Sequence, residues 1–334
     1  MSEVLIEVTR GPLVETMHRG DVAVVDAAGR LVAAVGGPRA KVAFWRSSAK
    51  PFQCLPVVAA GAADRFGLGP QDLALFCGSH NGEPVHVARA EAVLRRIGLG
   101  AAALACGAHP PLDGPSAAAL RRDRAEPSAL HNNCSGKHAG MLALAVHLGA
   151  DPRRYLEPGQ PVQREILASV RRFTGLADEE IALGVDGCGV PCFGIAVDRM
   201  ALAFARLMDP SAVVEPHRGA AGRVRAAMLA HPYLVAGRDR FDTALMALGG
   251  GRILAKGGAS GVQCVGLEGG LGVALKIEDG AAGPGRAREV ATVEVLRQLG
   301  ALDAAGVAAL GRFARPVVRN VAGREVGEAR AALR

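Results

Sequence analysis

The sequence is poor in aromatic side chains, which make up 4% of its 334 residues and include a single Trp and two Tyr. Its hydrophobic core must therefore be built from aliphatic and small residues. Half of the chain is apolar, which is enough for one large domain or for two closely packed ones. These proportions exclude a disordered chain and favour helices packed closely on a sheet.

The sequence also lacks a long segment in which basic residues are concentrated. Its formal net charge is +7, but the arginines are scattered in short groups rather than gathered along one segment. Nucleic-acid binding usually needs a basic stripe and aromatic residues that stack on bases. Because both are missing, we expect no nucleic-acid partner.

No apolar run approaches the roughly 20 residues that span a bilayer. Glu3 and Glu7 stand where a secretion signal would need a positive start and an unbroken apolar run. We therefore expect a soluble, cytoplasmic protein without a membrane partner. The seven cysteines are odd in number and widely spaced, which favours thiols or metal ligands over disulfides.

The hydrophobic pattern changes from strands to helices and back to strands. Strands are expected near 4–8, 22–25, 31–35, 41–45, 252–255, 262–267, 271–277 and 316–322. Helices are expected near 47–67, 83–97, 116–125, 135–148, 160–173, 197–208, 218–230, 240–248 and 286–299, with a surface turn at 278–285.

This order indicates an α/β protein, in the form of an α+β sandwich whose sheet combines the N- and C-terminal strands. A helical lobe is inserted between them. We expect one catalytic unit over 1–334, with its sheet part at about 1–46 and 250–334 and its helical part at about 47–249.

The stretch WRSSAKPFQ places Ser47 three residues before Lys50, a spacing that brings side chains together on one helix face. A neutral lysine can take the proton of a serine as the serine attacks a carbonyl. Its pKa must then be lowered, by burial or by a second cation. The alternative is that Ser47 or Ser48 caps a helix and that Lys50 is solvated.

Two further stretches extend this pattern. GSHNG contains Ser79 and Asn81 just before a predicted helix, and AKGG contains Lys256 and Gly258 beside a predicted strand. In chain order, these motifs resemble the three-part signature of penicillin-recognising serine enzymes and serine β-lactamases. The glycines would let a substrate approach the strand edge, where main-chain N–H groups can hold an oxyanion.

A cysteine and lysine cluster is the most unusual feature of the chain. HNNCSGKHAGM places Cys134, Lys137 and His138 at the start of an apolar helix. VDGCGVPC adds Asp186, Cys188 and Cys192 in a glycine-rich loop after a predicted strand. Two thiolates with nitrogen donors suit zinc, although a lysine ligand is rare. Buried structural cysteines are the alternative.

Six segments together resemble the L-asparaginase II family, the Rhizobium etli type of asparaginase, over essentially the whole chain. They are VETMHRGDVAVVD, WRSSAKPFQ, CGSHNGEPVHV, HNNCSGKHAGM, VDGCGVPCF and LAKGGASGV. The resemblance implies a fold like that of serine β-lactamases and penicillin-binding proteins, and a homodimer.

The resemblance also implies roles for individual residues. It implies a first serine–lysine pair at Ser47 and Lys50, a second at Ser79 and Lys256, and a zinc site at Cys134, Lys137 and Cys188. It places His138 and Asp186 around the metal. Further candidates for the surroundings of the substrate are Arg46, Asn81 and Ala259.

We therefore expect an amidohydrolase that converts L-asparagine to L-aspartate and ammonia through a Ser-Lys acyl-enzyme, with Zn²⁺ positioning the substrate. A serine β-lactamase or peptidase-like hydrolase, a glutaminase, and a zinc- or thiol-based sensor remain as alternatives. The chain alone does not decide between asparagine and glutamine, because one methylene changes binding by only ~1–3 kcal/mol.

Overall fold

The computed structural model describes residues 1–280 and 286–333, and the chain forms two compact units. The sheet unit comprises Met1–Ser48, Ile195–Asp209 and Leu248–Arg334. The helical unit comprises Ala49–Gly194 and Pro210–Ala247. The turn expected at 278–285 lies largely outside the described residues.

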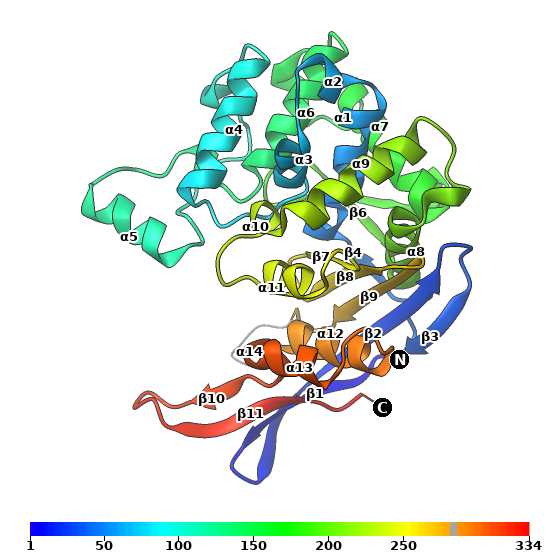
Figure 1. Ribbon diagram of the computed structural model, residues 1–334, viewed down its shortest axis with the longest axis vertical. Coiled ribbons are helices and arrows are strands. Elements are labelled where there is room, and N and C mark those ends of the chain that lie inside the picture. Colours follow the sequence, from blue (N-terminus) through cyan, green and yellow to red (C-terminus); the bar gives the residue numbers. More distant parts are fainter. Residues whose placement is uncertain (281–285, 334) are drawn as a thin grey trace. The chain divides into compact units, whose positions relative to one another are not determined.

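The sheet unit is built on antiparallel strands from both ends of the chain. They are β1 (Glu3–Arg10), β2 (Leu13–Asp26), β3 (Leu31–Val35), β4 (Val42–Phe44), β7 (Ile253–Gly257), β8 (Val262–Leu267), β9 (Leu271–Ile277), β10 (Val317–Arg319) and β11 (Glu325–Ala331). Within the described residues, the eight-stranded sheet has the order β10-β11-β1-β2-β9-β8-β7, with β3 paired to β2 (Figure 1). The mixed α/β class and the sheet of terminal strands are therefore confirmed.

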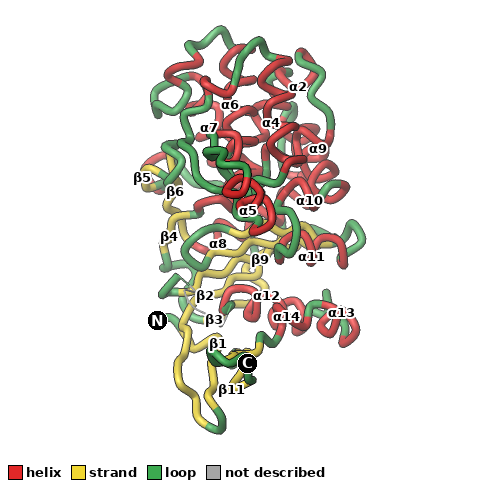
Figure 2. Tube along the Cα trace, turned by 90° about the vertical axis from the view of Figure 1, so that its left-hand side faces the viewer, coloured by secondary structure: helices red, strands yellow, loops and turns green. Residues whose placement is uncertain are grey.

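Helices cover this sheet. Every residue of β8 is buried, so both faces of this strand are covered. Helix α8 (Val197–Met208) packs on β2, β8 and β9, and α12 (Ala287–Gln298) packs on β1, β8, β9 and β11 (Figure 2). The short helices α13 (Ala304–Ala309) and α14 (Gly311–Ala314) follow α12.

The helical unit is organised around two buried helices, α1 and α6. Its helices are α1 (Lys50–Ala59), α2 (Ala62–Arg65), α3 (Pro70–Phe76), α4 (Pro84–Arg96), α5 (Gly114–Arg122), α6 (Ser135–His147), α7 (Pro161–Thr174), α9 (His217–Ala230), α10 (Pro232–Val235) and α11 (Phe241–Leu248). Helix α1 packs on α6, α7 and α9, and α6 also packs on α3 and α4. Most positions of α1 and α6 are buried, as expected of apolar helices at the centre of a unit.

The segment that carries Asp186 and Cys188 forms a short hairpin, of which the sequence indicated only the first strand and the loop. Strand β5 (Ala182–Val185) pairs antiparallel with the first residues of β6 (Pro191–Ala196). The connecting turn carries Asp186 and Cys188, and hydrogen bonds from the main chain of Asp186 to Val190 and of Gly189 to Asp186 close it. The hairpin therefore places both of these residues in a defined turn. Among the described residues, no helix combines the length and apolarity needed to cross a bilayer.

Candidate active site

The predicted site residues are divided between the two units. The sheet unit contains Arg46, Ser47, Lys256 and Ala259. The helical unit contains Lys50, Ser79, Asn81, Cys134, Lys137, His138, Asp186 and Cys188. Each unit therefore holds part of the predicted set.

A short 3₁₀ turn, Arg46–Ala49, carries the two neighbouring serines. Helix α1 begins directly after it, at Lys50. The N-cap position of this helix is Ala49, where no side chain caps the first turn. The interpretation that a serine caps this helix is therefore wrong.

The two serines have different environments. Ser48 is fully buried, and its hydroxyl donates a hydrogen bond of 2.9 Å to the main-chain carbonyl of Lys256. The approach of these segments is close, since a Cβ on Gly258 would lie 2.9 Å from the Ser48 Oγ and from the Trp45 carbonyl oxygen. Ser47 is partly exposed, so it is the more accessible of the two hydroxyls.

Lys256 lies on β7, the edge strand of the sheet order. Its side chain is buried, and its Nζ donates a hydrogen bond of 2.7 Å to the carbonyl of Gly257. Ala259 follows just beyond the end of the strand. Arg46 has a left-handed backbone with φ of 53°, a strained conformation that is common at functional sites.

Lys50 is the first residue of α1, and its side chain is fully buried. Its Nζ lies 2.5 Å from the Gly78 carbonyl oxygen, 2.9 Å from the Ser79 Oγ and 3.3 Å from the Asn133 carbonyl oxygen. Burial lowers the pKa of Lys50 because water no longer stabilises its charge, and the charge of Lys137 lowers it further, against the effect of nearby sulfur atoms.

The Nζ of Lys50 donates to all three oxygens, and these three contacts match the three N–H groups of a charged amine. A neutral amine has two hydrogens and one lone pair, and carbonyl oxygens can only accept hydrogen bonds. Once uncharged, the Lys50 amine would keep its hydrogens on the Gly78 and Asn133 carbonyls and present its lone pair to the hydroxyl of Ser79. The structure thus brings Lys50 and Ser79 together, although the sequence assigned them to different pairs.

The predicted metal ligands gather beside this pair. The Nζ of Lys137 donates a hydrogen bond of 2.9 Å to the Sγ of Cys188. A hydrogen bond from Cys188 lowers the pKa of Cys134 well below its ordinary value against the effect of burial, and the charges of Lys50 and Lys137 lower it further. The same hydrogen bond and burial raise the pKa of Cys188. The pKa values of the two thiols are therefore shifted in opposite directions.

The pKa of Lys137 depends on the same two sulfur atoms. Burial alone would lower its pKa, but Cys134 and Cys188 outweigh burial and raise it. Two sulfurs and one amine nitrogen in a buried cluster match the donor types that zinc prefers. Among the described residues, no group of three or more His, Cys, Asp or Glu side chains is arranged to hold a metal, so such a site depends on the lysine.

His138 lies next to this cluster. Its Nδ1 forms a hydrogen bond of 2.6 Å with the Tyr155 hydroxyl, which also accepts the main-chain N–H of Ala105 at 2.9 Å. The Nε2 of His138 has no hydrogen-bond partner among the described residues. Burial, followed by the charges of Lys137 and Lys50, holds the pKa of His138 well below its usual value.

Asp186 contributes from the turn between β5 and β6. It is half-buried, and its Oδ1 accepts a hydrogen bond of 2.8 Å from the main-chain N–H of Gly187. Its negative charge is among the influences that raise the pKa of Lys137. The structure therefore places Asp186 near the lysine and thiol cluster.

Hydrogen bonds that no sequence motif indicated join these groups. His80 accepts the Gly82 N–H at its Nδ1 (3.1 Å), so its Nε2 donates to the Ser135 Oγ (3.0 Å) at the start of α6. Its main-chain N–H also donates to the carbonyl of Asn133. His80 thereby ties the Ser79 segment to the helix of Lys137. In the sequence, the signal available for Asn133 was its place in HNN, directly before the candidate metal ligand Cys134.

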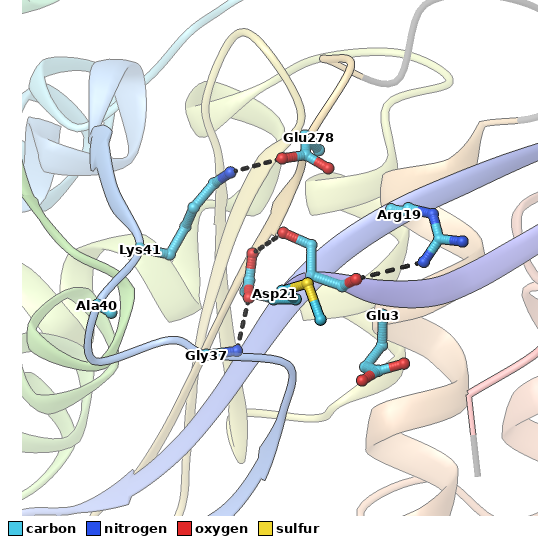
Figure 3. A pocket seen from close by; sticks show the side chains of 9 residues that line it. Glu3, Arg19, Asp21, Gly37, Ala40, Lys41 and Glu278 are labelled. Atoms are coloured by element: carbon cyan, nitrogen blue, oxygen red, sulfur yellow. Dashed lines mark hydrogen bonds and ion pairs between the residues drawn. The ribbon is translucent and has the colours of Figure 1, made fainter.

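A polar pocket of about 780 Å³ lies elsewhere in the sheet unit (Figure 3). Inside it, the Asp21 carboxylate accepts hydrogen bonds from the Ser2 hydroxyl and the Gly37 N–H, each at 2.7 Å. Lys41 pairs with Glu278 at 3.0 Å. None of the predicted site residues lines this pocket.

The fold and the site define a mixed α/β protein with a buried serine–lysine pair beside two thiols and a second lysine. A sequence profile of the L-asparaginase II family matches residues 6–331, nearly the whole chain. The chain therefore belongs to the L-asparaginase II family. A search of curated proteins finds no significant match.

Fifteen chains of solved structures match. They include Mglu in its glutamate form, with a TM-score of 0.38 and 15% identity over 85% of this chain and 61% of that chain. They also include Mglu in its native form in the presence of 4.3 M NaCl, with a TM-score of 0.35 and 16% identity over 84% of this chain and 61% of that chain. The chain thus covers less than two thirds of these structures, and a likeness this distant does not bear on its substrate.

Proposed function

We propose that this protein hydrolyses the side-chain amide of L-asparagine to L-aspartate and ammonia through an acyl-enzyme. Family membership supports amide hydrolysis. The observation that carries the mechanism is the buried Lys50 amine, which has a lowered pKa and lies 2.9 Å from the Ser79 hydroxyl. An uncharged amine is the base that an attacking serine needs.

In this proposal, Ser47 is the nucleophile and Lys50, three residues later in the chain, is its base. The Ser47 Oγ forms an ester with the amide carbon, and its proton passes to Lys50. Ser79, which is bonded to Lys50, delivers this proton to the leaving nitrogen, so that ammonia departs. Water then hydrolyses the ester, which releases aspartate and restores the serine.

Residues of the sheet unit are proposed to assist these steps. Lys256 supports proton transfer by Ser79, and the main-chain N–H groups of Ser47 and Ala259 stabilise the oxyanion. Arg46 contacts the substrate. These roles follow from the family resemblance and from the positions of the motifs in the chain.

We propose that Cys134, Lys137 and Cys188 hold a zinc ion. Their two sulfurs and one nitrogen are of the types that zinc prefers, and all three side chains are buried. When bound, the ion would supply a fixed positive charge that helps to hold the substrate, with His138 and Asp186 beside it.

Metal analysis tests the zinc site. Purified wild-type protein should contain zinc, and Cys188→Ser should lose it, whereas Cys54→Ser, which changes another buried cysteine of the helical unit, should retain it. Ammonia release before and after chelation then measures how far activity depends on the metal. Equal metal content in both variants, or no zinc binding by the wild type, would contradict the site.

The function is tested by a substrate panel of L-asparagine, L-glutamine and a chromogenic β-lactam. We expect the highest kcat/KM for asparagine. Preference for glutamine would assign a glutaminase, and β-lactam turnover would assign a β-lactamase-like enzyme. Ser47→Ala should reduce turnover by about 10³-fold or more with the fold intact, as expected when a nucleophile is removed.

A thiol-based sensor is the non-enzymatic alternative that one observation favours. The lowered pKa of Cys134 favours its thiolate, which is the reactive form of cysteine. A sensor would release no ammonia from any amide, so the same panel separates it from an enzyme.

We further propose, on the strength of the family resemblance, that the chain has the arrangement of serine β-lactamases and penicillin-binding proteins. On the same basis we propose that it forms a homodimer and acts in the cytoplasm. Light scattering of the purified protein tests the dimer.

A further inference from the structure

The residues around Ser79 are bonded to a second segment of the helical unit. We call residues 78–83 the serine loop and residues 231–240, which include α10, the clamp segment. The main-chain N–H of Ser79 donates a hydrogen bond of 2.8 Å to the carbonyl of Val235. The clamp segment thus holds the backbone of the proposed catalytic serine directly.

Asn81 and Glu83 of the serine loop form hydrogen bonds with both main-chain polar groups of Arg238. The Arg238 N–H donates to the Glu83 Oε1 at 2.9 Å, and the Asn81 Nδ2 donates to the Arg238 carbonyl at 2.9 Å. The Arg240 guanidinium donates to the Asn81 Oδ1, also at 2.9 Å. Asn81 and Glu83 are each only 3% exposed, so their polar atoms depend on the clamp segment for hydrogen bonds.

The second carboxylate oxygen of Glu83 accepts a hydrogen bond from the Tyr233 hydroxyl. The ring of Tyr233 stacks on His86 of α4, with centroids 5.9 Å apart and planes 3° from parallel. A buried carboxylate is costly unless it is hydrogen-bonded. Both oxygens of Glu83 are therefore engaged in holding the clamp segment.

The contact is tight at Gly237. This residue has φ of +113°, and a Cβ there would lie 2.5 Å from the Glu83 Oε1 and 2.8 Å from the Asn81 Nδ2. Only glycine fits between the two segments. Gly237→Ala should therefore push the clamp segment away from the serine loop without changing any side chain that takes part in the proposed reaction.

We propose that the clamp segment fixes Ser79 against Lys50, with Tyr233 and Glu83 as positioning residues. This inference rests on the proposed hydrolysis, in which Ser79 carries a proton from Lys50 to the leaving group. Proton transfer requires hydrogen-bond distance, and the Ser79 Oγ lies 2.9 Å from the Lys50 Nζ. Loosening the clamp lengthens this contact while every reacting group stays in the chain.

Steady-state kinetics on Tyr233→Phe and Gly237→Ala tests the catalytic effect. We expect kcat to fall by about 10- to 100-fold with KM nearly unchanged, because small misplacements of reacting groups slow chemistry by such factors. Glu83→Gln, which keeps an oxygen for the Arg238 N–H, should retain more activity than Glu83→Ala. Arg223→Ala is the control, since it breaks only an exposed ion pair with Asp64 in the same unit.

Hydrogen–deuterium exchange separates the clamp from the proposed reaction. Peptides that cover residues 78–83 should exchange faster in Tyr233→Phe and Gly237→Ala than in wild type, while melting temperatures show that the variants are folded. The inference would be overturned if exchange of residues 78–83 were unchanged, or if both variants kept the wild-type kcat. It would also be overturned if the fall in kcat only matched the fraction of unfolded protein. A second result is also decisive: the variants exchange faster in this loop, but the wild type hydrolyses no amide. It would contradict both the proposed function and the catalytic role of the clamp segment.

Discussion

Lys50 shows how strongly the chemistry of one side chain depends on its surroundings. In water, the pKa of a lysine is about 10.4, so the amine is charged and cannot accept a proton. Here, burial and the neighbouring charge of Lys137 lower this pKa, and two carbonyl oxygens accept the amine hydrogens. In its uncharged form the amine has a lone pair that can accept a proton, which is what a general base in acyl transfer requires.

Lys50→Arg tests this role. Arginine keeps a positive charge but stays protonated in proteins, so it cannot act as a base. We expect kcat to fall by about 10²–10⁴-fold, the usual contribution of a general base. The kinetics should be measured at a temperature where circular dichroism shows a folded variant. Retention of more than about a tenth of the wild-type kcat would contradict the role of Lys50.

The neighbouring serines provide a second test. Ser48→Ala removes a buried hydrogen bond to the Lys256 carbonyl and should lower the free energy of unfolding by about 1–3 kcal/mol while the folded protein stays active. Ser47→Ala should have the opposite profile, with little change in urea unfolding and loss of ammonia release. An exchange of these two profiles would show that Ser48, and not Ser47, is the nucleophile.

At this scale, the sequence identified the reactive residue types but not their contacts. The Ser-x-x-Lys spacing selected Ser47 over Ser48 as the partner of Lys50, but it did not predict that Ser48 is buried and Ser47 partly exposed. The partners of Lys50 at Gly78 and Asn133 are main-chain carbonyls, which every residue possesses. No side-chain pattern can therefore encode them.

Among the structural elements, a stack of rings connects the serine loop, α4 and the clamp segment. His80 stacks on His86 with centroids 4.9 Å apart, and His86 stacks on Tyr233. Burial lowers the pKa of both histidines, and for His80 the neighbouring His86 lowers it further. The stack is therefore built from uncharged rings.

Acid should weaken this stack. Above the unfolded-state pKa of about 6.5, both histidines are neutral in the folded and unfolded states, and they add no pH dependence. Below it, the unfolded chain binds protons that the folded protein does not, so the free energy of unfolding falls by up to about 1.4 kcal/mol per pH unit for each histidine. Urea unfolding between about pH 7.5 and pH 5.5 measures this loss.

His86→Phe provides the comparison for the acid effect, because it keeps a ring in the stack but cannot be protonated. Its stability should depend less steeply on pH than that of the wild type. Equal slopes for the two proteins, or a wild-type stability that does not fall in acid, would contradict uncharged histidines in the folded state.

The sequence predicted helices and strands well where apolar periodicity was strong, as in α6, α7, β8 and β9. It missed β11, whose sequence EVGEARA is rich in charged residues and becomes a strand by pairing with β1 and β10. It recognised the helix at 197–208 but assigned it to the helical part. In the structure, α8 packs on the sheet, because periodicity shows which face is apolar and not what covers that face.

At the scale of the whole molecule, the predicted site residues come from five separate regions of the chain and from both compact units. The helical unit brings Lys50, Ser79 and the cluster of two thiols and Lys137 together. The resemblance in the sequence named these residues, but spacing alone could not predict their proximity, since the contact between Lys50 and Ser79 depends on how α1 and the serine loop pack.

The central claim is that a serine of this chain takes the aspartyl group from asparagine. Turnover with L-asparagine, stopped by acid and followed by peptide mass analysis, tests it most directly. We predict an aspartyl ester on the peptide that contains Ser47 and none on that peptide in Ser47→Ala. Ammonia release without an ester on any serine, or an ester on the peptide that contains Ser79, would contradict the account.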